Sequence, residues 1–511
     1  MREHDSSIPE STRTSTASTT FEERTLAEQE QVEPITVEED TGAKNTDRGE
    51  RGRLQTLLGF LKESSGVKDI TNVRVSLPAS ACDPLSGLEY FTIMDHPQEF
   101  VKIAAETTPE GRMLAVVRFV FSSFRLHMNK IMKSFNPVLG ETYRCHWEVD
   151  STPGVQLPST FKPHGTDTPP TTGKTYSVDY RAEQLSHHPP KGAFWYRCKE
   201  LGVELVGLFQ VVAQFTGLAV RINHRYGMTL SITLPPNTPS NPTSEAVVER
   251  YRITQPNGEL RGLLVLSPYV ALVDYCVIVC RDTKMRTVIR FKEDSFFSLR
   301  SKFEILGNIS RYNPDKPHTL KSPSLAIDDE TVLYTLSGSW KSAVSLRQES
   351  KSSSRGSTSS SSSSLIDMST LPTSTRILPP LSTLHPTDSR IVWQATTTAL
   401  ATARWSDATR NKAHVEDAQR DKARTRPPGW THTPRLFRGH AEEWWWELGP
   451  GPKGYDAGGG QDWVPEGEKA EVGGLWVELE YLGDEGEGAL GESARVEPKF
   501  DGFVAVESDT E

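Results

Sequence analysis

A chain of 511 residues is long enough for more than one domain, but its 36% hydrophobic fraction is diluted by 37 Gly, 34 Pro and many Ser and Thr. This composition predicts one folded body with unstructured segments. The five cysteines are widely spread without paired spacing, which indicates neither a disulfide framework nor a four-ligand zinc site and fits a reducing compartment. Because no apolar leader and no run of 18 apolar residues occurs, we expect a cytoplasmic protein that meets intracellular membranes only peripherally.

The net charge of −10 is unevenly distributed along the chain. Residues 438–511 hold 19 Asp and Glu against 5 Lys and Arg, a net of −14 that leaves +4 for the rest. A mildly basic body suits anionic lipid headgroups but lacks the concentrated basic face of a nucleic-acid binder. We therefore expect no nucleic-acid partner, and we treat 438–511 as an acidic tail rich in Gly, Glu and Trp.

The first 50 residues are rich in Ser, Thr and Glu with few clustered apolar residues, which predicts a disordered arm. Four leucines follow at positions i, i+3, i+4 and i+7, namely Leu54, Leu57, Leu58 and Leu61. This spacing predicts a short amphipathic helix. The pattern fits a helix packed on the body equally well as a mobile lid or a membrane-touching helix.

A second helix is predicted from Gly111 to about Met132, where apolar residues recur at helical spacing. After it, β-branched and aromatic runs alternate with Gly, Pro and Asn turns, as consecutive antiparallel strands do. A sheet of this length hides its edges by curling and closing. The predicted strands are Tyr176 to Gln184, Val203 to Ile222, Met228 to Leu234, Val247 to Ile253, Leu263 to Ser267, Ala271 to Cys280 and Thr287 to Lys292.

Two further segments complete the predicted body, which spans residues 51–437. A Ser-rich stretch of low complexity at about 348–375 predicts a disordered insertion. Residues 390–426 form a highly charged helical stretch that ends at the two prolines Pro427 and Pro428.

The segment Glu183-Gln-Leu-Ser-His-His-Pro-Pro190, called the fingerprint segment below, is the most informative stretch. Its two prolines hold His187 and His188 in an extended segment and remove two backbone donors, so paired imidazoles project from a rigid strand end, where they can donate to a phosphate. A metal site is disfavoured, because adjacent strand residues point to opposite faces and no third ligand is near. Taken alone, such a turn is more often structural than functional.

Two other elements present cations. Residues 133–141 form a tight loop marked by Asn136-Pro137 and Gly140, which would present Lys133 together with backbone N–H groups as an anion site, although a solvated lysine beside a turn is the alternative. Lys412, Glu416 and Arg420, at i, i+4 and i+8, lie along one helix stripe of ~12 Å. An ordinary ion-paired helix face has the same spacing.

Together these segments resemble the signature of the oxysterol-binding protein family. The fingerprint segment matches the family's EQVSHHPP except at Leu185, and residues 133–141 match its KPxNPxLGE loop except at Ser134. The resemblance covers roughly residues 54–437. Further matches are Leu266 to Val270, Leu333 to Trp340, His385-Pro386 with Ser389, Arg390 and Trp393, and Glu416 to Arg420.

The resemblance implies a mainly β fold with flanking helices: a large, nearly closed antiparallel β-barrel around a hydrophobic tunnel, an N-terminal lid at about 54–77 and a C-terminal helical region. It also implies a non-enzymatic lipid-transfer protein that binds phosphatidylinositol 4-phosphate. Such a tunnel replaces the bilayer, because each methylene exposed to water costs ~0.8 kcal/mol. The implied headgroup contacts are Lys133, Phe135, Asn136, His187, His188, Lys412, Glu416 and Arg420.

The second lipid stays open between a sterol and a phospholipid such as phosphatidylserine. Phe209 and the pair His127-Met128 stand near positions where sterol-carrying relatives have polar residues, which counts weakly against a sterol. A phosphoinositide sensor or scaffold that moves no lipid would use the same headgroup residues and is the main alternative.

An enzyme is the less favoured reading. Cys280 and Arg286 fit the C-x5-R spacing of thiol phosphatases, but the residues between them lack glycine and lie between two predicted strands rather than before a helix. Other catalytic motifs and cofactor loops are absent from the sequence, so we expect neither catalysis nor a cofactor.

Overall fold

The computed structural model describes most of the chain, and the predicted lid leucines Leu54, Leu57, Leu58 and Leu61 lie outside the part that it describes. Among the described residues, no helix is both long and apolar enough to cross a bilayer. The described residues are 35–36, 59, 75–76, 79, 82–90, 92, 96–124, 133–150, 175–187, 190–224, 226–265, 267–292, 303–314, 331–349, 362–428, 430, 432–443 and 475–481.

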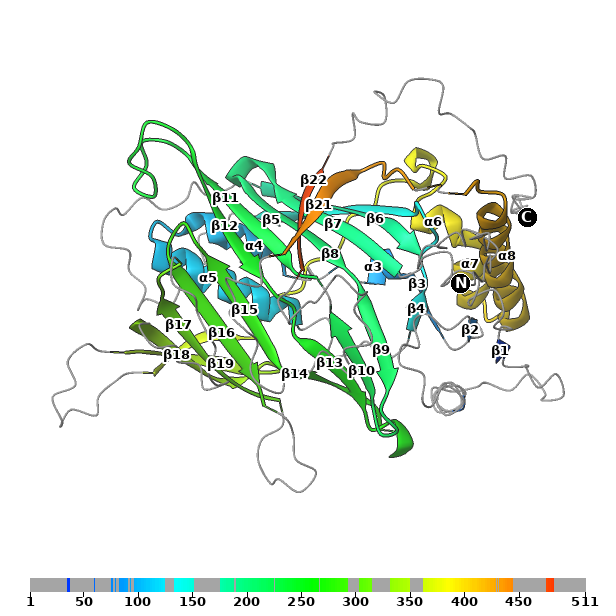
Figure 1. The fold of residues 1–511 in the computed structure, drawn as a ribbon, viewed down its shortest axis with the longest axis horizontal. Coiled ribbons are helices and arrows are strands. Elements are labelled where there is room, and N and C mark those ends of the chain that lie inside the picture. The colour runs from blue at the N-terminus through cyan, green and yellow to red at the C-terminus, as the bar shows by residue number, and fades with distance from the viewer. Residues whose placement is uncertain are drawn as a thin grey trace, which may run out of the picture.

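A long antiparallel sheet dominates the fold, and within the described residues it contains twelve strands (Figure 1). Its order is β20-β19-β18-β17-β16-β15-β12-β11-β8-β7-β6-β5. The strands are β5 (Thr142–Asp150), β6 (Thr175–His187), β7 (Pro190–Cys198), β8 (Val203–Phe209), β11 (Met228–Leu234), β12 (Val247–Ile253), β15 (Tyr275–Cys280), β16 (Met285–Phe291), β17 (Glu304–Arg311), β18 (Thr331–Ser339), β19 (Ala343–Gln348) and β20 (Ser362–Asp367). The prediction of a mainly β fold with flanking helices is confirmed.

A second, separate sheet has the order β14-β13-β10-β9. The chain enters this small sheet twice, from β8 at Gln210 and again after β12, and its second return to the large sheet is at Asp274, whose φ is +66°. Asp tolerates this left-handed conformation better than most residues. The strands are β9 (Val211–Phe215), β10 (Val220–His224), β13 (Asn257–Arg261) and β14 (Tyr269–Val273). The predicted single strands Val203 to Ile222 and Ala271 to Cys280 are therefore wrong, since each is divided between the two sheets.

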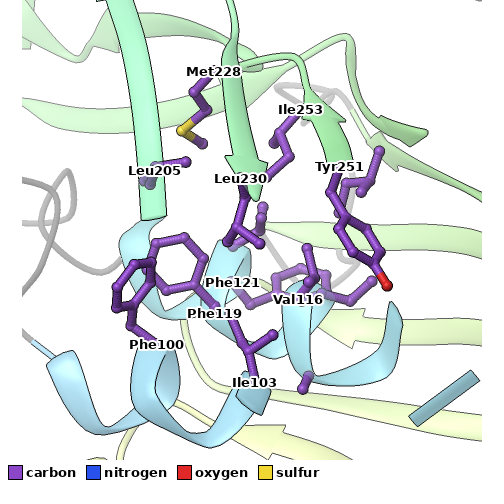
Figure 2. Close-up of a cluster of buried hydrophobic side chains, with 14 of the residues drawn as sticks. Phe100, Ile103, Val116, Phe119, Phe121, Leu205, Met228, Leu230, Tyr251 and Ile253 are labelled. Carbon is purple, nitrogen blue, oxygen red and sulfur yellow. The ribbon is translucent and has the colours of Figure 1, made fainter. Parts of the chain in front are cut away.

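Helices pack on one face of the large sheet. The long helix α5 (Pro109–Phe124) presents Phe119 and Phe121 to Leu205 and Leu230 of β8 and β11, as Figure 2 shows. Its Arg112 guanidinium donates to both carboxylate oxygens of Glu249 on β12, at 2.5 and 2.8 Å. The helix is thus fixed by an apolar surface and by one buried bidentate ion pair. Beside it lie α4 (Pro97–Val101) and the 3-10 helix Lys102–Ala105, whereas α3 (Gly87–Tyr90) contacts β5 and β6.

The segment that follows β20 runs to β5, at the other end of the strand order. Ile377 exchanges two backbone hydrogen bonds with His146 of β5, of 2.8 and 3.1 Å, and the Thr142 N–H donates to the Thr387 carbonyl at 3.0 Å. These bonds occupy donors and acceptors that an uncovered edge strand would expose. Residues 377–388, called the edge segment below, therefore cover β5.

Three helices follow, and they occupy the helical stretch predicted at 390–426. They are α6 (Ser389–Val392), α7 (Gln394–Ala401) and α8 (Trp405–Arg424). Asp388 caps α6 by accepting from the Arg390 N–H at 2.9 Å. Ala403 adopts a φ of +54° between α7 and α8, so the chain turns there.

Other predictions need correction. The Ser-rich insertion predicted to extend to about Thr375 instead forms strand β20 at Ser362–Asp367, because its backbone completes the ladder with β19. The predicted strand Leu263 to Ser267 begins as a 3-10 helix, Leu263–Val265. Short strands also occur outside the predicted sheet. β1 (Ile35–Thr36), in the predicted arm, pairs with β2 (Val75–Ser76), at the end of the predicted lid, and β21 (Phe437–Glu443) pairs with β22 (Leu475–Tyr481), in the predicted tail.

Candidate functional site

The predicted 133–141 loop is organised around the fully buried carboxylate of Glu141, and it begins with strand β4 (Lys133–Phe135), which pairs with β3 (Cys82–Ser86). The carboxylate of Glu141 accepts from the Val138 N–H at 2.9 Å, the Ser389 hydroxyl at 2.6 Å, the Trp393 indole N–H at 3.0 Å and the Ser86 hydroxyl. Burial raises the pKa of Glu141 to about 7, although these four donors act in the opposite direction. One carboxyl group therefore closes the loop and joins it to β3 and α6.

An aromatic stack packs beneath the backbone of the same loop, on its buried side. The rings of Phe135 and Trp393 lie 4.7 Å apart at an interplanar angle of 28°. Both side chains are buried, and they share an apolar cluster with Phe215, Val220 and Leu263 of the small sheet. Phe135 is thus a packed support of the loop, whereas the next residue of the loop, the predicted contact residue Asn136, is exposed.

The fingerprint segment is hydrogen-bonded directly to this loop. The Gln184 N–H donates to the Glu141 carbonyl at 2.8 Å, and the Gly140 N–H donates to the Gln184 carbonyl at 2.9 Å. Further along the segment, Nδ1 of His187 lies 3.1 Å from the Pro137 carbonyl, which can only accept, so Nδ1 carries the proton. The two motifs therefore form one rigid unit.

The first residue of the fingerprint segment has a role that the sequence analysis missed. Glu183 is fully buried, and its carboxylate accepts from the backbone N–H groups of Arg435 and Leu436 at 2.7 to 3.0 Å. His432 Nε2 lies 3.3 Å from the same carboxylate. Glu183 thus anchors the chain that leaves the end of α8. The sequence gives no sign of this role, because the same strand also carries Asp179, Arg181 and Gln184.

Helix α8 presents the predicted cation stripe. Lys412 is 5% exposed, and its Nζ lies 2.7 Å from one carboxylate oxygen of Glu416, while an Arg420 nitrogen lies 3.6 Å from the other. The side chain of Arg420 is 50% exposed and also pairs with Asp417. A hydrogen bond of 3.1 Å from Asn411 to the Ala395 carbonyl fastens α8 to α7.

Burial lowers the pKa of His187, the Pro137 hydrogen bond and Glu416 raise it, and Arg426 and Arg420 lower it. The net pKa lies below the usual value, so His187 is mostly neutral near pH 7. Val415 of α8 packs against the cluster that contains Phe135 and Trp393, so α8 lies beside the 133–141 loop, to which His187 is hydrogen-bonded.

We call the eight predicted contact residues the candidate site. Lys133 begins β4, but its side chain lies outside the described part of the structure, as does all of His188. The others are described, and they are Phe135, Asn136, His187, Lys412, Glu416 and Arg420.

The thiol-phosphatase alternative has no structural support. Residues 281–284 form a turn between the antiparallel strands β15 and β16, so in this described segment Cys280 is followed by a strand and not by a helix. Burial raises the pKa of the Cys280 thiol to about 11. A catalytic cysteine needs the opposite change, because the thiolate is the nucleophile.

Comparison with known proteins agrees with this geometry. Residues 56–457 match the sequence model of the family described as oxysterol-binding protein. The chain belongs to this family and carries its lipid-binding domain. The family consists of lipid-binding and lipid-transfer proteins.

Individual relatives are distant. Oxysterol-binding protein-like protein 1 of Schizosaccharomyces pombe is 26% identical over 493 residues, which cover 79% of this chain and 92% of the relative. Human oxysterol-binding protein-related protein 10 is 25% identical over 412 residues, covering 77% of this chain but 48% of the relative, so the chain spans about half of that protein. A crystal structure of the Osh1 ORD domain in complex with cholesterol has a similar fold, with a TM-score of 0.54, 21% identity, and coverage of 83% of this chain and 92% of that one.

Proposed function

We propose that the chain binds the headgroup of phosphatidylinositol 4-phosphate at the candidate site and exchanges this lipid for a second lipid between membranes. The observation that carries the proposal is the packing of Val415 of α8 against the cluster that contains Phe135, next to the loop to which His187 is hydrogen-bonded. Segments far apart in sequence thereby supply phosphate-binding groups to one place.

The chemistry of the stripe suits a phosphorylated inositol. Glu416 lies between Lys412 and Arg420, so three charged groups carry one net positive charge. A phosphate can accept from the exposed Arg420 guanidinium, which offers directed donors, and from Lys412 as a compact charge. Glu416 can keep both cations aligned and accept from an inositol hydroxyl.

The acyl chains need a compartment of their own. Burying a chain of about 16 carbons at ~0.8 kcal/mol per methylene requires an apolar cavity closed from water. We propose that the large sheet encloses this tunnel and that Leu54, Leu57, Leu58 and Leu61 cover it as a lid. The second lipid is a sterol or a phospholipid such as phosphatidylserine.

This function needs transient contact with intracellular membranes and no covalent chemistry. The protein would act in the cytoplasm, as a peripheral membrane protein, and release lipid because the two ligands compete for one tunnel. A gradient of the phosphoinositide between two membranes would then drive the second lipid uphill.

The test is lipid extraction followed by identification of the cargo. The full chain is incubated with liposomes of mixed composition that contain phosphatidylinositol 4-phosphate, re-isolated, and analysed by mass spectrometry. We expect this lipid and one second species in the wild-type protein, and loss of the phosphoinositide alone in the double variant His187→Ala with His188→Ala. Headgroup-dependent liposome binding without any extraction would favour the sensor or scaffold.

A further inference from the structure

Three aliphatic side chains are exposed at one end of the small sheet. Leu218, in the turn between β9 and β10, is 65% exposed, and Leu264 and Val265, after β13, are 47% and 76% exposed. β10 lies between β9 and β13, and its first residue, Val220, is opposite the last residue of β9 and the penultimate residue of β13. Both connections therefore leave the sheet at the same end (Figure 1). We call Leu218, Leu264 and Val265 the tip.

Local hydrogen bonds and glycines define the shape of the tip. The turn is closed by a 2.9 Å bond from the Thr216 N–H to the Ala219 carbonyl, and Gly217 has a φ of +89°. In the other connection, the Ser267 N–H donates to the Gly262 carbonyl at 3.1 Å. A Cβ at Gly262 would lie 2.1 Å from the Ser267 carbonyl oxygen, so glycine is required there. The aliphatic side chains are thus held outward by ordered backbone.

The base of the tip is continuous with the candidate site. Phe215, Val220 and Leu263, each next to or near a tip residue, are buried in the cluster that contains Phe135 and Trp393. Because Phe135 supports the 133–141 loop, the exposed tip and the headgroup contacts are attached to the same packed unit.

The charge pattern favours a membrane over a protein partner. Residues 216–219 and 262–268 contain no charged residue. At the base, Arg221 pairs with Glu259 and Asp274 at 3.0 and 2.7 Å, and Arg261 pairs with Glu259 at 2.6 Å, so these charges cancel. Three side chains are also too few for a stable protein interface, which buries at least about 1,200 Å² in total.

We propose that the tip is an interfacial anchor that inserts Leu218, Leu264 and Val265 among the acyl chains of a membrane while lipid passes through the neighbouring site. The inference rests on the proposed lipid function and adds the surface that meets the bilayer. Because apolar burial drives the insertion, binding needs no anionic lipid and changes little with salt. Three side chains give weak and reversible attachment, which suits a protein that must leave the membrane again.

The main experiment compares two triple variants of the full chain. The tip variant is Leu218→Ser, Leu264→Ser, Val265→Ser, and the matched control is Ile377→Ser, Leu378→Ser, Leu381→Ser, which removes three aliphatic side chains that are 38 to 45% exposed on the edge segment. Flotation with phosphatidylcholine vesicles that contain no phosphoinositide measures membrane binding. We expect the tip variant to bind at least ~10-fold more weakly than wild type and the control to bind like wild type.

A second measurement tests whether the tip enters the bilayer. The five native cysteines are all buried, so a cysteine introduced as Leu218→Cys can be labelled selectively with an environment-sensitive fluorophore. Its emission should shift to the blue on neutral vesicles, whereas a label at Leu378→Cys should not shift. The proposal would be overturned if wild type and the tip variant floated equally, or if both triple variants lost binding equally. It would also be overturned if ultracentrifugation showed a dimer that depends on the tip while flotation did not change.

Failure of the headgroup function is separable from failure of the tip. A short-chain, water-soluble phosphatidylinositol 4-phosphate, offered without a bilayer, should bind the tip variant and wild type equally. If wild type does not bind the soluble lipid, but the tip variant still floats less with neutral vesicles than wild type, the headgroup assignment is wrong and the anchor stands. If both bind it but neutral vesicles never recruit wild type, the anchor is wrong.

Discussion

The interface between α5 and the large sheet differs from the surroundings of the candidate site in the kind of contact that holds the segments together. Around α5, buried aromatic and aliphatic side chains of helix and strands meet, with the Arg112–Glu249 pair as a polar contact (Figure 2). At the candidate site, two buried carboxylates, Glu141 and Glu183, reach segments that lie about 250 residues further along the chain. The packing around α5 should tolerate the loss of one polar group, because apolar contacts dominate it. The arrangement of the candidate site should instead depend on a few hydrogen-bond acceptors, chiefly the two carboxylates. Site geometry and global stability should therefore respond to different mutations.

Truncating the α5 core gives the largest expected effect. Phe119→Ala removes a buried ring that packs against Phe100 at 5.4 Å, which should lower the free energy of unfolding by ~3–5 kcal/mol. Chemical denaturation followed by tryptophan fluorescence measures this change. Folded molecules of the variant should bind the phosphoinositide headgroup as wild type does. A specific loss of headgroup affinity would show that the two regions are coupled.

Glu141 should make stability depend on pH. Its folded-state pKa is raised from 4.5 to about 7, so the folded protein holds the proton more tightly than the unfolded chain. The resulting stabilisation is complete below pH 4.5 and is lost as pH rises through about 7, an effect of at most ~3 kcal/mol.

Glu141→Gln provides the matched comparison for this pH dependence. The glutamine oxygen can replace Oε2, which accepts from the Val138 and Trp393 N–H groups, and its NH2 group can face the hydroxyls of Ser86 and Ser389. Wild type should lose stability relative to this variant between about pH 5 and pH 8 in denaturant titrations. A constant difference across this range would mean that Glu141 stays ionised in the folded protein.

Arg420 should affect binding far more than folding. Because its side chain is half exposed, Arg420→Ala should barely change the unfolding midpoint, but loss of a charge-assisted phosphate contact worth ~1.5–3 kcal/mol should weaken headgroup binding at least ~10-fold. Arg410→Ala is the control, since Arg410 is on the same helix, exposed, and paired with Asp407. Equal binding by both variants in isothermal titration calorimetry would remove Arg420 from the site.

Glu183→Gln should give the smallest change in affinity with the clearest local signature. Glutamine keeps one oxygen acceptor for the N–H groups of Arg435 and Leu436 but loses the charge, which should cost ~1–2 kcal/mol locally. We expect faster amide hydrogen exchange at 432–437 and a few-fold weaker headgroup binding. Unchanged exchange in this segment would show that the carboxylate does not anchor it.

The sequence predicts the elements whose pattern is local. Strands β11 and β12 have the predicted bounds, Met228–Leu234 and Val247–Ile253, because their buried residues alternate regularly with more exposed ones. The bends at Gln210 and Asp274 were not predicted, since an apolar run gives no sign that it changes sheets. Ser362–Asp367 was assigned to a disordered insertion because composition does not reveal pairing with β19.

The same distinction applies to the candidate site. Family resemblance supplied the contact residues, and the structure packs Val415 of α8 beside the loop to which His187 is hydrogen-bonded. The supports of the site, Glu141 and Glu183, were not predicted as such, because their partners at Ser389 and Arg435 are defined only by the folded chain. Spacing rules act over a few turns of helix and do not reach across such separations.

The edge segment has a consequence for synthesis on the ribosome. Strand β5 leaves the ribosome more than 200 residues before the edge segment that covers it. The backbone N–H groups of Arg435 and Leu436, which donate to the Glu183 carboxylate, are synthesised even later. At about 5–20 residues per second, the nascent chain exposes an uncovered strand for tens of seconds. We therefore expect chaperones to engage the growing polypeptide during this interval, and the lipid site to become competent only when translation is nearly complete.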